Sequence, residues 1–536
     1  MTSPAPDPPP ISAAQKWAIT FTVMVVAFMQ ILDTSVANVI LPHLQGSLSA
    51  GLDEVSWVIT SYLAANAIVI PATGWLVGLF GRKRVFLVCA CLFVASSFLS
   101  GAAPDLSTLI IARIFQGLGG GPIIPLSQAI LWEIFPFHQR GLAMAVWGVG
   151  FILGPILGPT LGGYLADEWS WRWIFYINLP VGAVGFLMAL AFLFDPPYLR
   201  KVVHIDWWGL VLMVAGFGCL QLVLDRGERE DWFESTTIVA LAVVAVGSLT
   251  AFLLRELVTH DPILDLTVFG DRNFATGATL SALVGFGMFS GLLLIAVFTQ
   301  KLLGYDAWTA GMVLAPGGVG NICSLFASGL VTRVDQRWML AFGCLLNAVS
   351  LYMMTYLTLG MDYWTLAIPR FIQGFAVGFI YVPLSTLTLA TIRREKLVNA
   401  TAVYGMLRNF GGSVGIAVVT TLLAQRSQVH QATLVGHITS WDAETQVRLA
   451  RWASHFVSLG SDAFTAQRQA VAMIYRETVA QAQLLAYADD FWLLAVMFTV
   501  VPLLLPLMRR IRLAPAASSA ATGDRAPERA VEEGAL

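Results

Sequence analysis

The chain has 536 residues, of which 57% are hydrophobic and only 12% are charged, and its mean hydropathy is +0.73. A soluble domain carries about 25% charged residues, so an apolar excess of this size needs lipid as its solvent. The 31 basic and 33 acidic residues give a net charge of −2, which provides no basic excess for binding nucleic acid. We therefore predict an all-α, polytopic membrane protein.

The chain opens with a proline-rich tail, residues 1–16, which lacks the basic region of a cleavable signal peptide. A helix needs roughly 20 apolar residues to cross the ~30 Å hydrocarbon core, and fourteen segments have that character. The predicted spans are 17–41, 55–80, 85–103, 106–131, 141–166, 173–194, 206–225, 236–257, 274–300, 309–331, 338–358, 364–390, 398–424 and 490–508. A second tail, 509–536, follows them. An even number of spans places both tails on one side of the membrane.

Arginine and lysine indicate which side this is, because cytoplasmic loops carry an excess of both. With a cytoplasmic N-terminus, the short inner loops and flanks hold seventeen basic residues and the short outer loops hold four. The inner set is Lys16, Arg82, Lys83, Arg84, Arg140, Arg200, Lys201, Arg255, Arg272, Arg333, Arg337, Arg393, Arg394, Lys396, Arg509, Arg510 and Arg512; the outer set is Arg172, Arg226, Arg229 and Lys301. Both termini are therefore predicted to be cytoplasmic.

An internal repeat relates the two halves of the chain. The fourth span reads Arg-Ile-Phe-Gln-Gly from Arg113 and the twelfth reads Arg-Phe-Ile-Gln-Gly from Arg370, and a Pro-Leu-Ser follows in each. Both spans run inward, so the halves are parallel repeats. Two extra spans must then lie between two six-helix bundles. The predicted organisation is 6 + 2 + 6: an N-terminal bundle (17–194), two extra helices with linkers (195–273), and a C-terminal bundle (274–508).

One outer segment, residues 425–489, is much longer than the other loops. Two stretches of it, 446–457 and 463–487, have helical character, and Gly460 and Ser461 mark a break between them. Two interpretations are open: a folded cap over the outer mouth, or a docking surface for an extracytoplasmic partner.

Signals of soluble enzymes are missing. The chain has no Walker loop, no zinc-ligand spacing and no dinucleotide-binding fingerprint after a strand. Its five cysteines all lie in apolar runs, which gives neither a disulfide framework nor a metal site. We predict a protein that is not an enzyme and that uses no cofactor and no metal.

Charge inside the membrane is the better guide to function, because each such residue costs at least about 2.5–3.5 kcal/mol at the bilayer centre. Asp33 is the only carboxylate well inside a predicted span. It lies about 12 Å from the outer end of its span and Arg113 lies about 10 Å deep in the fourth, at 1.5 Å per residue. The pair could form a salt bridge that loads and releases a proton. The alternative is a purely structural hydrogen bond or ion pair.

Two further cations, Arg370 and Arg408, lie in spans without a carboxylate left to pair with them. Their partners could be backbone carbonyls, Asn and Gln side chains, or an anionic substrate. Aromatic and polar residues of the inward-facing spans could line a substrate cavity, with packing as the alternative. The candidates are Gln116, Trp147, Tyr404, Arg408 and Asn409.

The fifth span carries glycine at every fourth position and two prolines between Gly150 and Gly163. Small residues permit close helix contact and proline favours a kink. We predict a hinge or a tight seam between the two bundles, formed by Gly154, Pro155, Gly158 and Gly162.

Together these elements resemble the major facilitator superfamily, and within it the fourteen-helix drug:proton antiporters of the EmrB/QacA type. The likeness covers residues 17–508. It rests on the first-helix motif Leu32–Pro42, which includes Asn38, on Arg113–Gly121, on the antiporter-like segment Gly150–Gly163, and on Trp171–Pro180. The loop motif from Gly74 through Gly81 and Arg82 departs from the superfamily pattern, because Gly78 stands where an Asp is usual. Glu133 is a candidate to pair with Arg82 or Arg84 instead.

The resemblance implies a proton-coupled antiporter of a bacterial inner membrane that exports hydrophobic or amphipathic compounds. Asp33 and Arg113 would couple protons, Asn38 would join the substrate-binding residues, and Gly74, Gly81 and Arg82 would take part in conformational change. The long outer loop leans toward EmrB-like pumps, which implies a periplasmic adaptor and an outer-membrane channel as partners. Two alternatives remain: a proton-coupled importer or facilitator of a metabolite, and a receptor or scaffold that does not transport.

Overall fold

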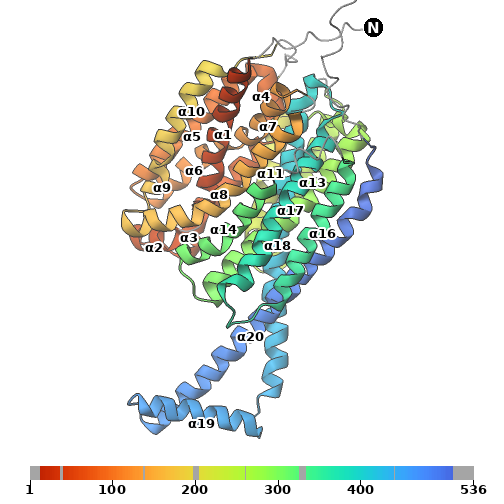
Figure 1. The fold of residues 1–536 in the computed structure, drawn as a ribbon. Coiled ribbons are helices and arrows are strands. Elements are labelled where there is room, and N and C mark those ends of the chain that lie inside the picture. Colours follow the sequence, from red (N-terminus) through yellow and green to blue (C-terminus); the bar gives the residue numbers. More distant parts are fainter. Residues whose placement is uncertain are drawn as a thin grey trace, which may run out of the picture.

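The computed structural model describes residues 12–36, 40–136, 139–196, 205–259, 261–324, 334–439 and 441–510. Within these ranges the regular secondary structure is entirely helical. Two groups of long helices lie side by side in a common direction, and a helical hairpin projects from one end (Figure 1). We call the end where the first helix begins the N face and the opposite end the hairpin face. The predicted all-α class is confirmed.

The first group contains the helices up to residue 192. They are α1 (Ala13–Val36), α2 (Leu41–Leu48), α3 (Leu52–Val69), α4 (Thr73–Phe80), α5 (Arg82–Ala102), α6 (Leu106–Gly120), α7 (Ile123–Ile134), α8 (Arg140–Glu168), α9 (Trp173–Tyr176) and α10 (Asn178–Phe192). Breaks interrupt three of the predicted spans, namely between α3 and α4, between α6 and α7, and between α9 and α10. The α3 and α4 segments are bent by 61° at a break that contains Pro71, and Pro122 follows the end of α6. Proline lacks the N–H group that would continue the hydrogen-bond ladder, which accounts for the first two of these breaks.

The two extra helices are α11 (Trp207–Arg226) and α12 (Thr236–Glu256), joined through the short helix η2 (Trp232–Glu234). They pack against one another, and α11 also packs against α3 of the first group and α18 of the second. Arg255 at the end of α12 binds the buried carboxylate of Asp206, with 2.7 Å between Nη2 and Oδ1. This ion pair fastens the ends of the two helices together.

The second group begins after η3 (Leu266–Gly270). Its helices are α13 (Arg272–Val297) with η4 (Phe298–Leu302), α14 (Ala307–Cys323), α16 (Gln336–Met353) with η6 (Met354–Tyr356), α17 (Tyr363–Leu389), η7 (Arg394–Lys396), α18 (Leu397–His437), α19 (Ala443–Ser458), and α20 (Ala463–Val500) with η8 (Val501–Leu507). The α17 helix is the most enclosed of them, because α13, α14, α16 and α8 all pack against it.

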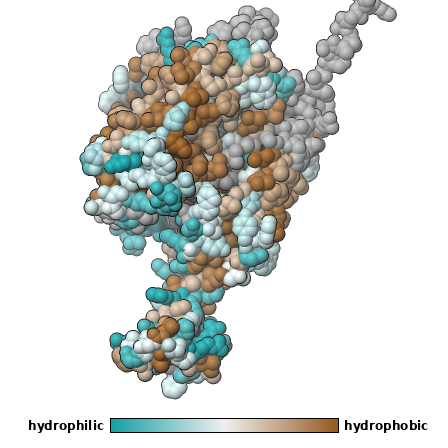
Figure 2. Space-filling model, turned by 60° about the vertical axis from the view of Figure 1, so that its left-hand side comes forward, coloured by the Kyte–Doolittle hydropathy of each residue, from teal (hydrophilic) through white to brown (hydrophobic). Residues whose placement is uncertain are grey.

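Eleven helices of the described residues are long and apolar enough to cross a membrane, and the bent pair α3–α4 makes a twelfth. The α8 helix, with 29 residues, and α14, with 17, occupy the positions of the other two predicted spans. The arrangement is therefore compatible with fourteen spans. Figure 2 shows hydrophobic residues spread over the side of the helical body, as a surface in contact with lipid requires.

The two groups pack in the same way around the segments that the sequence repeats. On α6, a Cβ atom added to Gly117 would lie 2.4 Å from the backbone oxygen of Tyr62 on α3. On α17, a Cβ atom added to Gly374 would lie 1.7 Å from the backbone oxygen of Gly317 on α14. Glycine is needed at both places because the backbones meet there. The sequence repeat is thus matched by a structural one, in which Tyr62 and Gly317 occupy equivalent positions.

The groups touch one another toward both ends. Near the N face, a Cβ atom on Gly74 of α4 would lie 2.9 Å from Cα of Asn399 on α18. Toward the hairpin face, a Cβ atom on Gly311 of α14 would lie 2.1 Å from Oγ1 of Thr160 on α8.

The hairpin consists of the far half of α18, the helix α19 and the first half of α20 (Figure 1). Helices thus lie where the sequence predicted them, with α18 continuing unbroken beyond its predicted span. At its base, Oδ2 of Asp489 lies 2.9 Å from Nε2 of His430 and 3.6 Å from Nε of Arg426. Hydrophilic residues are frequent on the hairpin (Figure 2), which suits a segment outside the membrane.

Candidate functional site

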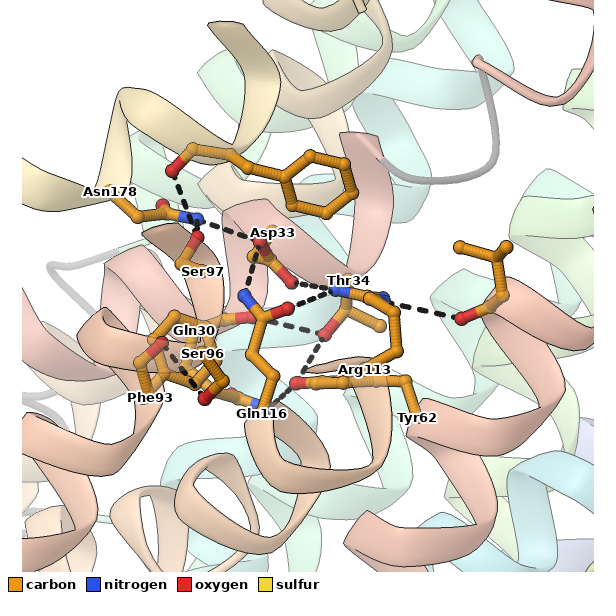
Figure 3. A network of polar contacts seen from close by, with 12 residues as sticks. Gln30, Asp33, Thr34, Tyr62, Phe93, Ser96, Ser97, Arg113, Gln116 and Asn178 are labelled. Atoms are coloured by element: carbon orange, nitrogen blue, oxygen red, sulfur yellow. Dashed lines mark hydrogen bonds and ion pairs between the residues drawn. The ribbon is translucent and has the colours of Figure 1, made fainter. Parts of the chain in front are cut away.

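A buried carboxylate lies at the centre of the first helix group. Asp33 on α1 is 1% exposed. Its Oδ2 accepts a hydrogen bond from Nη1 of Arg113 at 2.7 Å, and its Oδ1 accepts from Nε2 of Gln116 at 2.9 Å and from Nδ2 of Asn178 at 2.7 Å (Figure 3). Three helices, α6, α10 and α1, therefore meet at one anion. The predicted contact between Asp33 and Arg113 is confirmed.

The guanidinium of Arg113 also has several partners, although its Nη2 has no hydrogen-bond partner among the described residues. Its Nη1 also donates to Oε1 of Gln116 at 2.7 Å, and its Nε donates to the backbone oxygen of Val58 at 3.2 Å. The ring of Tyr62 lies beneath it, with its centroid 4.2 Å from Cζ. A buried charge needs this number of partners, because desolvation of each ion costs several kcal/mol.

A second set of polar groups fixes the partners of Asp33. Asn178 also donates to Oγ of Ser97 at 3.0 Å. The hydroxyl of Tyr62 accepts from Nε2 of Gln30 at 2.9 Å and from Oγ1 of Thr34 at 3.1 Å (Figure 3). Thr34 is the neighbour of Asp33 on α1, so the network ties this turn of the helix to α3 and α5 as well.

This arrangement suits reversible proton binding. In a dry interior the attraction between Asp33 and Arg113 is strong, because little solvent screens it. A proton added to Asp33 removes that attraction and leaves Arg113 as an uncompensated buried cation, which is an unfavourable state. A proton on Asp33 would therefore favour a rearrangement that separates α1 from α6, and its loss would restore the attraction between Asp33 and Arg113.

The sequence analysis did not identify two buried polar residues, Asn178 and Asp490. Asn178 lies just after the break between α9 and α10, and an amide in an otherwise apolar run was the available signal. Asp490 on α20 is 1% exposed, and its Oδ2 has no hydrogen-bond partner among the described residues. Asp33 is therefore not the only buried carboxylate among the described residues, whereas its being the only one well inside a predicted span stays a prediction. Asp490 stands at the start of its predicted span, and the continuation of α20 into the hairpin buries it.

A second cluster lies between the two helix groups. The ring centroid of Trp147 on α8 is 5.2 Å from Cζ of Arg408 on α18, and Trp147 Nε1 donates to Oγ of Ser127 at 3.2 Å. Arg408 also interacts electrostatically with Tyr381 and Tyr404. A small cavity nearby is shared by α8, α14 and α17, and is lined by Ala145, Gly148, Asn321, Ser324, Val377, Gly378, Tyr381 and Val382. Aromatic rings, a cation and an apolar wall thus come together between the groups.

The predicted cavity residues divide into three sets. Trp147, Tyr404 and Arg408 lie together in the cluster just described. Gln116 instead belongs to the network around Asp33, and Asn409 is half-buried beside Arg408 on α18. Asn38 lies outside the described residues. The sequence therefore identified most of the cluster but did not separate it from the charge network.

The glycine stripe of α8 does not form a seam between the two groups, so the predicted seam was wrong, and the alternative of a hinge stays a prediction. Cβ atoms added to Gly154, Gly158 and Gly162 would lie 2.4, 2.4 and 2.6 Å from side-chain atoms of Ile31, Ser35 and Val36 respectively, all on α1. The stripe therefore packs α8 against the helix segment that carries Asp33. The opposite face of α8 meets α14 and α17. The fourfold spacing specifies a close helix contact but not which helix makes it. The side chain of Pro155, within the stripe, is outside the described part.

Interactions of Arg82 hold the loop after α4 against other residues of the first group. Gly81 ends α4 with a φ of +86°, a conformation that other residues rarely adopt. Nη1 of Arg82 binds Oε2 of Glu133 at 2.5 Å and its Nη2 donates to the backbone oxygen of Phe194 at 3.1 Å. The predicted pairing of Arg82 with Glu133 is confirmed. Contact with the second group is made by Gly74 through close packing on Asn399 instead of by charge.

Comparison with known proteins agrees with this geometry. The family model of the Major Facilitator Superfamily matches residues 23–416. The chain is 36% identical to the multidrug export protein EmrB of Escherichia coli K12 over 92% of this chain and 95% of the relative. It is also 36% identical to the fatty acid resistance protein FarB of Neisseria gonorrhoeae, over 85% of this chain and 90% of the relative.

Solved structures show the same fold at low identity. The human organic anion transporter MFSD10 superposes with a TM-score of 0.56 at 16% identity, covering 92% of this chain and all of the other. The proton:xylose symporter XylE superposes with a TM-score of 0.57 at 14% identity, covering 92% of this chain and 95% of the other. The chain therefore belongs to the Major Facilitator Superfamily, and within it to the EmrB-like drug:proton antiporters.

Proposed function

We propose that this transporter exports hydrophobic and amphipathic compounds in exchange for protons, with Asp33 as the proton carrier and Arg113 as its charged partner. The observation that carries the proposal is the enclosed carboxylate of Asp33, which joins three helices through hydrogen bonds from Arg113, Gln116 and Asn178. Relatives named for multidrug export, fatty acid resistance and colistin resistance support a substrate range of this kind.

The cluster between the helix groups is the proposed substrate site. Trp147, Tyr381 and Tyr404 offer flat apolar surfaces, and Arg408 offers a cation beside them. Such a site holds ligands mainly by burial of apolar area, which discriminates weakly between similar compounds. It lies on α8, α17 and α18, and α8 packs through its glycine stripe on α1. A movement of α1 at Asp33 would thus reach the substrate site through one intervening helix, with Gly154, Gly158 and Gly162 forming the contact.

The test is drug-dependent proton flux into liposomes that contain the purified protein, under an imposed pH gradient. Asp33→Asn keeps the size of the side chain and removes its protonation, so it should abolish the flux while the protein still binds drug. The matched control is Asp206→Asn, which alters another buried, arginine-paired carboxylate far from the network. Flux that persists in Asp33→Asn would refute the role of Asp33. Movement of the drug in the same direction as the protons, instead of in the opposite direction, would refute export.

We further propose that the protein lies in a bacterial inner membrane with both termini in the cytoplasm. The seventeen basic residues of the predicted inner loops, against four in the outer ones, support this orientation. Reporter fusions after Arg510 and within the loop 459–462 test it. The first should be active only as a cytoplasmic reporter and the second only as an extracytoplasmic one. The reverse pattern would contradict the proposal.

The helical hairpin is the proposed contact with a periplasmic adaptor, which would connect the pump to an outer-membrane channel. Exposed hydrophobic side chains at its tip support a protein partner: Trp441 is 94% exposed, and Val447, Leu459 and Phe464 are exposed as well. Replacement of residues 438–462 by a short glycine linker should leave proton flux in liposomes intact and abolish resistance in cells. Full resistance in cells that carry this variant would exclude the adaptor contact.

A further inference from the structure

The second helix group contains a copy of the Asp33 network from which the acid is missing. Arg370 and Gln373 on α17 repeat Arg113 and Gln116 on α6 in sequence and in spacing. The equivalence extends to the neighbours. A Cβ atom added to Gly291 on α13 would lie 3.4 Å from Nε2 of Gln373, just as Asp33 on α1 receives Nε2 of Gln116. Gly291 therefore takes the position of Asp33.

The other partners of the acid are replaced as well. The same Cβ position at Gly291 would lie 3.6 Å from Cδ2 of Leu351 on α16 and 3.9 Å from Cδ1 of Leu494 on α20. In the first group these directions are occupied by the polar residues Ser97 on α5 and Asn178 on α10. The aromatic ring beneath the guanidinium is also absent, because Gly317 stands at the position of Tyr62.

The second helix group does, by contrast, retain the buried cation, which is Arg370. Arg370 is 6% exposed, and in the described part of the chain it has no carboxylate partner. Its Nη1 donates to Oε1 of Gln373, and its Nε has no hydrogen-bond acceptor among the described residues. A lone buried guanidinium is costly, since both its charge and its unused donors are removed from water.

The orientation of Gln373 indicates what is missing. Because Oε1 accepts from the guanidinium, which can only donate, the amide nitrogen must be the atom that points toward Gly291. Gln116 has the same orientation, and there the nitrogen donates to a carboxylate. Arg370 and Gln373 thus present donors in the arrangement that binds Asp33 in the first group, while glycine at 291 and 317 removes two side chains from the space beside them.

We propose that Arg370 and Gln373 form a site for a single monovalent anion, which replaces the missing acid between α13 and α17. The anion is either the carboxylate group of an anionic substrate or a free small anion such as acetate or chloride. In the first case the proposal rests on the proposed export function and specifies one of its substrate classes. A rearrangement that separates the helices around Arg370 would then give the ligand access to the enclosed guanidinium.

Three variants test the site: one supplies the missing charge, one is its uncharged control, and one removes the arginine. Gly291→Asp supplies the missing carboxylate from the chain itself, at a position where an added Cβ atom makes only ordinary contacts. It should unfold at a higher temperature than the wild type in sulfate buffer and should no longer respond to acetate or chloride. Gly291→Asn has the same shape without the charge and should not gain this stability. Arg370→Gln should also lose the response to anions.

The measurement is thermal unfolding of the purified full-length protein while acetate or chloride replaces sulfate at constant ionic strength. The wild type should show a saturable rise of about 2 °C or more. An amphipathic probe, pyrenebutyrate, and its neutral amide are then compared by energy transfer from tryptophan. Binding of the acid at least about tenfold tighter than the amide, lost in Gly291→Asp and displaced by acetate, identifies the substrate carboxylate as the ligand. Equal binding of acid and amide, together with the stability response, identifies a free anion.

The proposal is overturned if the wild type shows no saturable response to anions, or if the response persists unchanged in Gly291→Asp. Its failure can be distinguished from failure of the transport proposal. Asp33→Asn should lose proton flux and keep the anion response, so loss of the flux in this variant together with no anion response in the wild type would overturn the anion site alone.

Discussion

The contact between α8 and α1 provides the most direct test of how the packing supports transport. A Cβ atom added to Gly158 would lie 2.4 Å from Cβ of Ser35. Carbon atoms that are not bonded pack at about 3.5–4.0 Å, so Gly158→Ala must move the two helices apart by about 1 Å. Overpacking of this kind costs about 1–3 kcal/mol. Because Ser35 is two residues from Asp33, the displacement also disturbs the carboxylate and its partners.

We expect Gly158→Ala to unfold at a lower temperature than the wild type and to show reduced drug-dependent proton flux. The clash can be relieved from the other side, since Ser35→Gly removes the atom that the new methyl group meets. The double variant should recover most of the loss in both measurements. A suitable control is Gly247→Ala on α12, where an added Cβ atom has no neighbour within 4 Å. Wild-type stability of Gly158→Ala, or no recovery in the double variant, would show that the stripe is not a tight contact.

Two further predictions concern charged groups near the N face. Arg82→Gln leaves Glu133 buried without its ion partner, which should destabilise the protein by about 3–5 kcal/mol. The double variant Arg82→Gln with Glu133→Gln should recover part of the lost stability, measured by thermal unfolding. Equal stability of the wild type and both variants would contradict the prediction. Burial raises the pKa of Asp265, but hydrogen bonds from Lys396 and Thr267 outweigh it and hold that pKa below its usual 3.8. The stabilisation from this carboxylate is therefore present at neutral pH and is lost as the pH falls below about 4. Lys396→Met should make the unfolding temperature less sensitive to acid in that range, and an unchanged acid sensitivity would refute the pairing.

Local features of the sequence were sufficient for much of the fold. The length and apolarity of each segment predicted the helices, because a membrane requires every backbone group to be satisfied within its own helix. The repeat from Arg113 and Arg370 predicted two related bundles with α11 and α12 between them. Even the contact of Asp33 with Arg113 followed from their depths, since distance along a straight helix is set by its rise per residue.

The sequence could not predict contacts that depend on how one helix is rotated about its own axis relative to its neighbour. The stripe of Gly154, Gly158 and Gly162 could have faced either group, and only the packed structure directs it to α1. Asn178 begins α10 and donates to Asp33, and Asp490 is buried within α20, a helix that begins at Ala463, well before the predicted start of its span.

The surroundings of Arg370 show most clearly what the sequence determines and what only the packing decides. The sequence established that the arginine and glutamine of the repeat are present twice, and that only the first copy has an acid at a matching depth. Which residue stands in place of that acid depends on how α13, α16 and α20 surround α17. The structure places Gly291, Leu351 and Leu494 there. Composition and periodicity determine which segments enter the membrane and how far, because these are properties of single helices. The surroundings of a charge are decided by tertiary packing, because they are formed by helices that lie far apart in the chain.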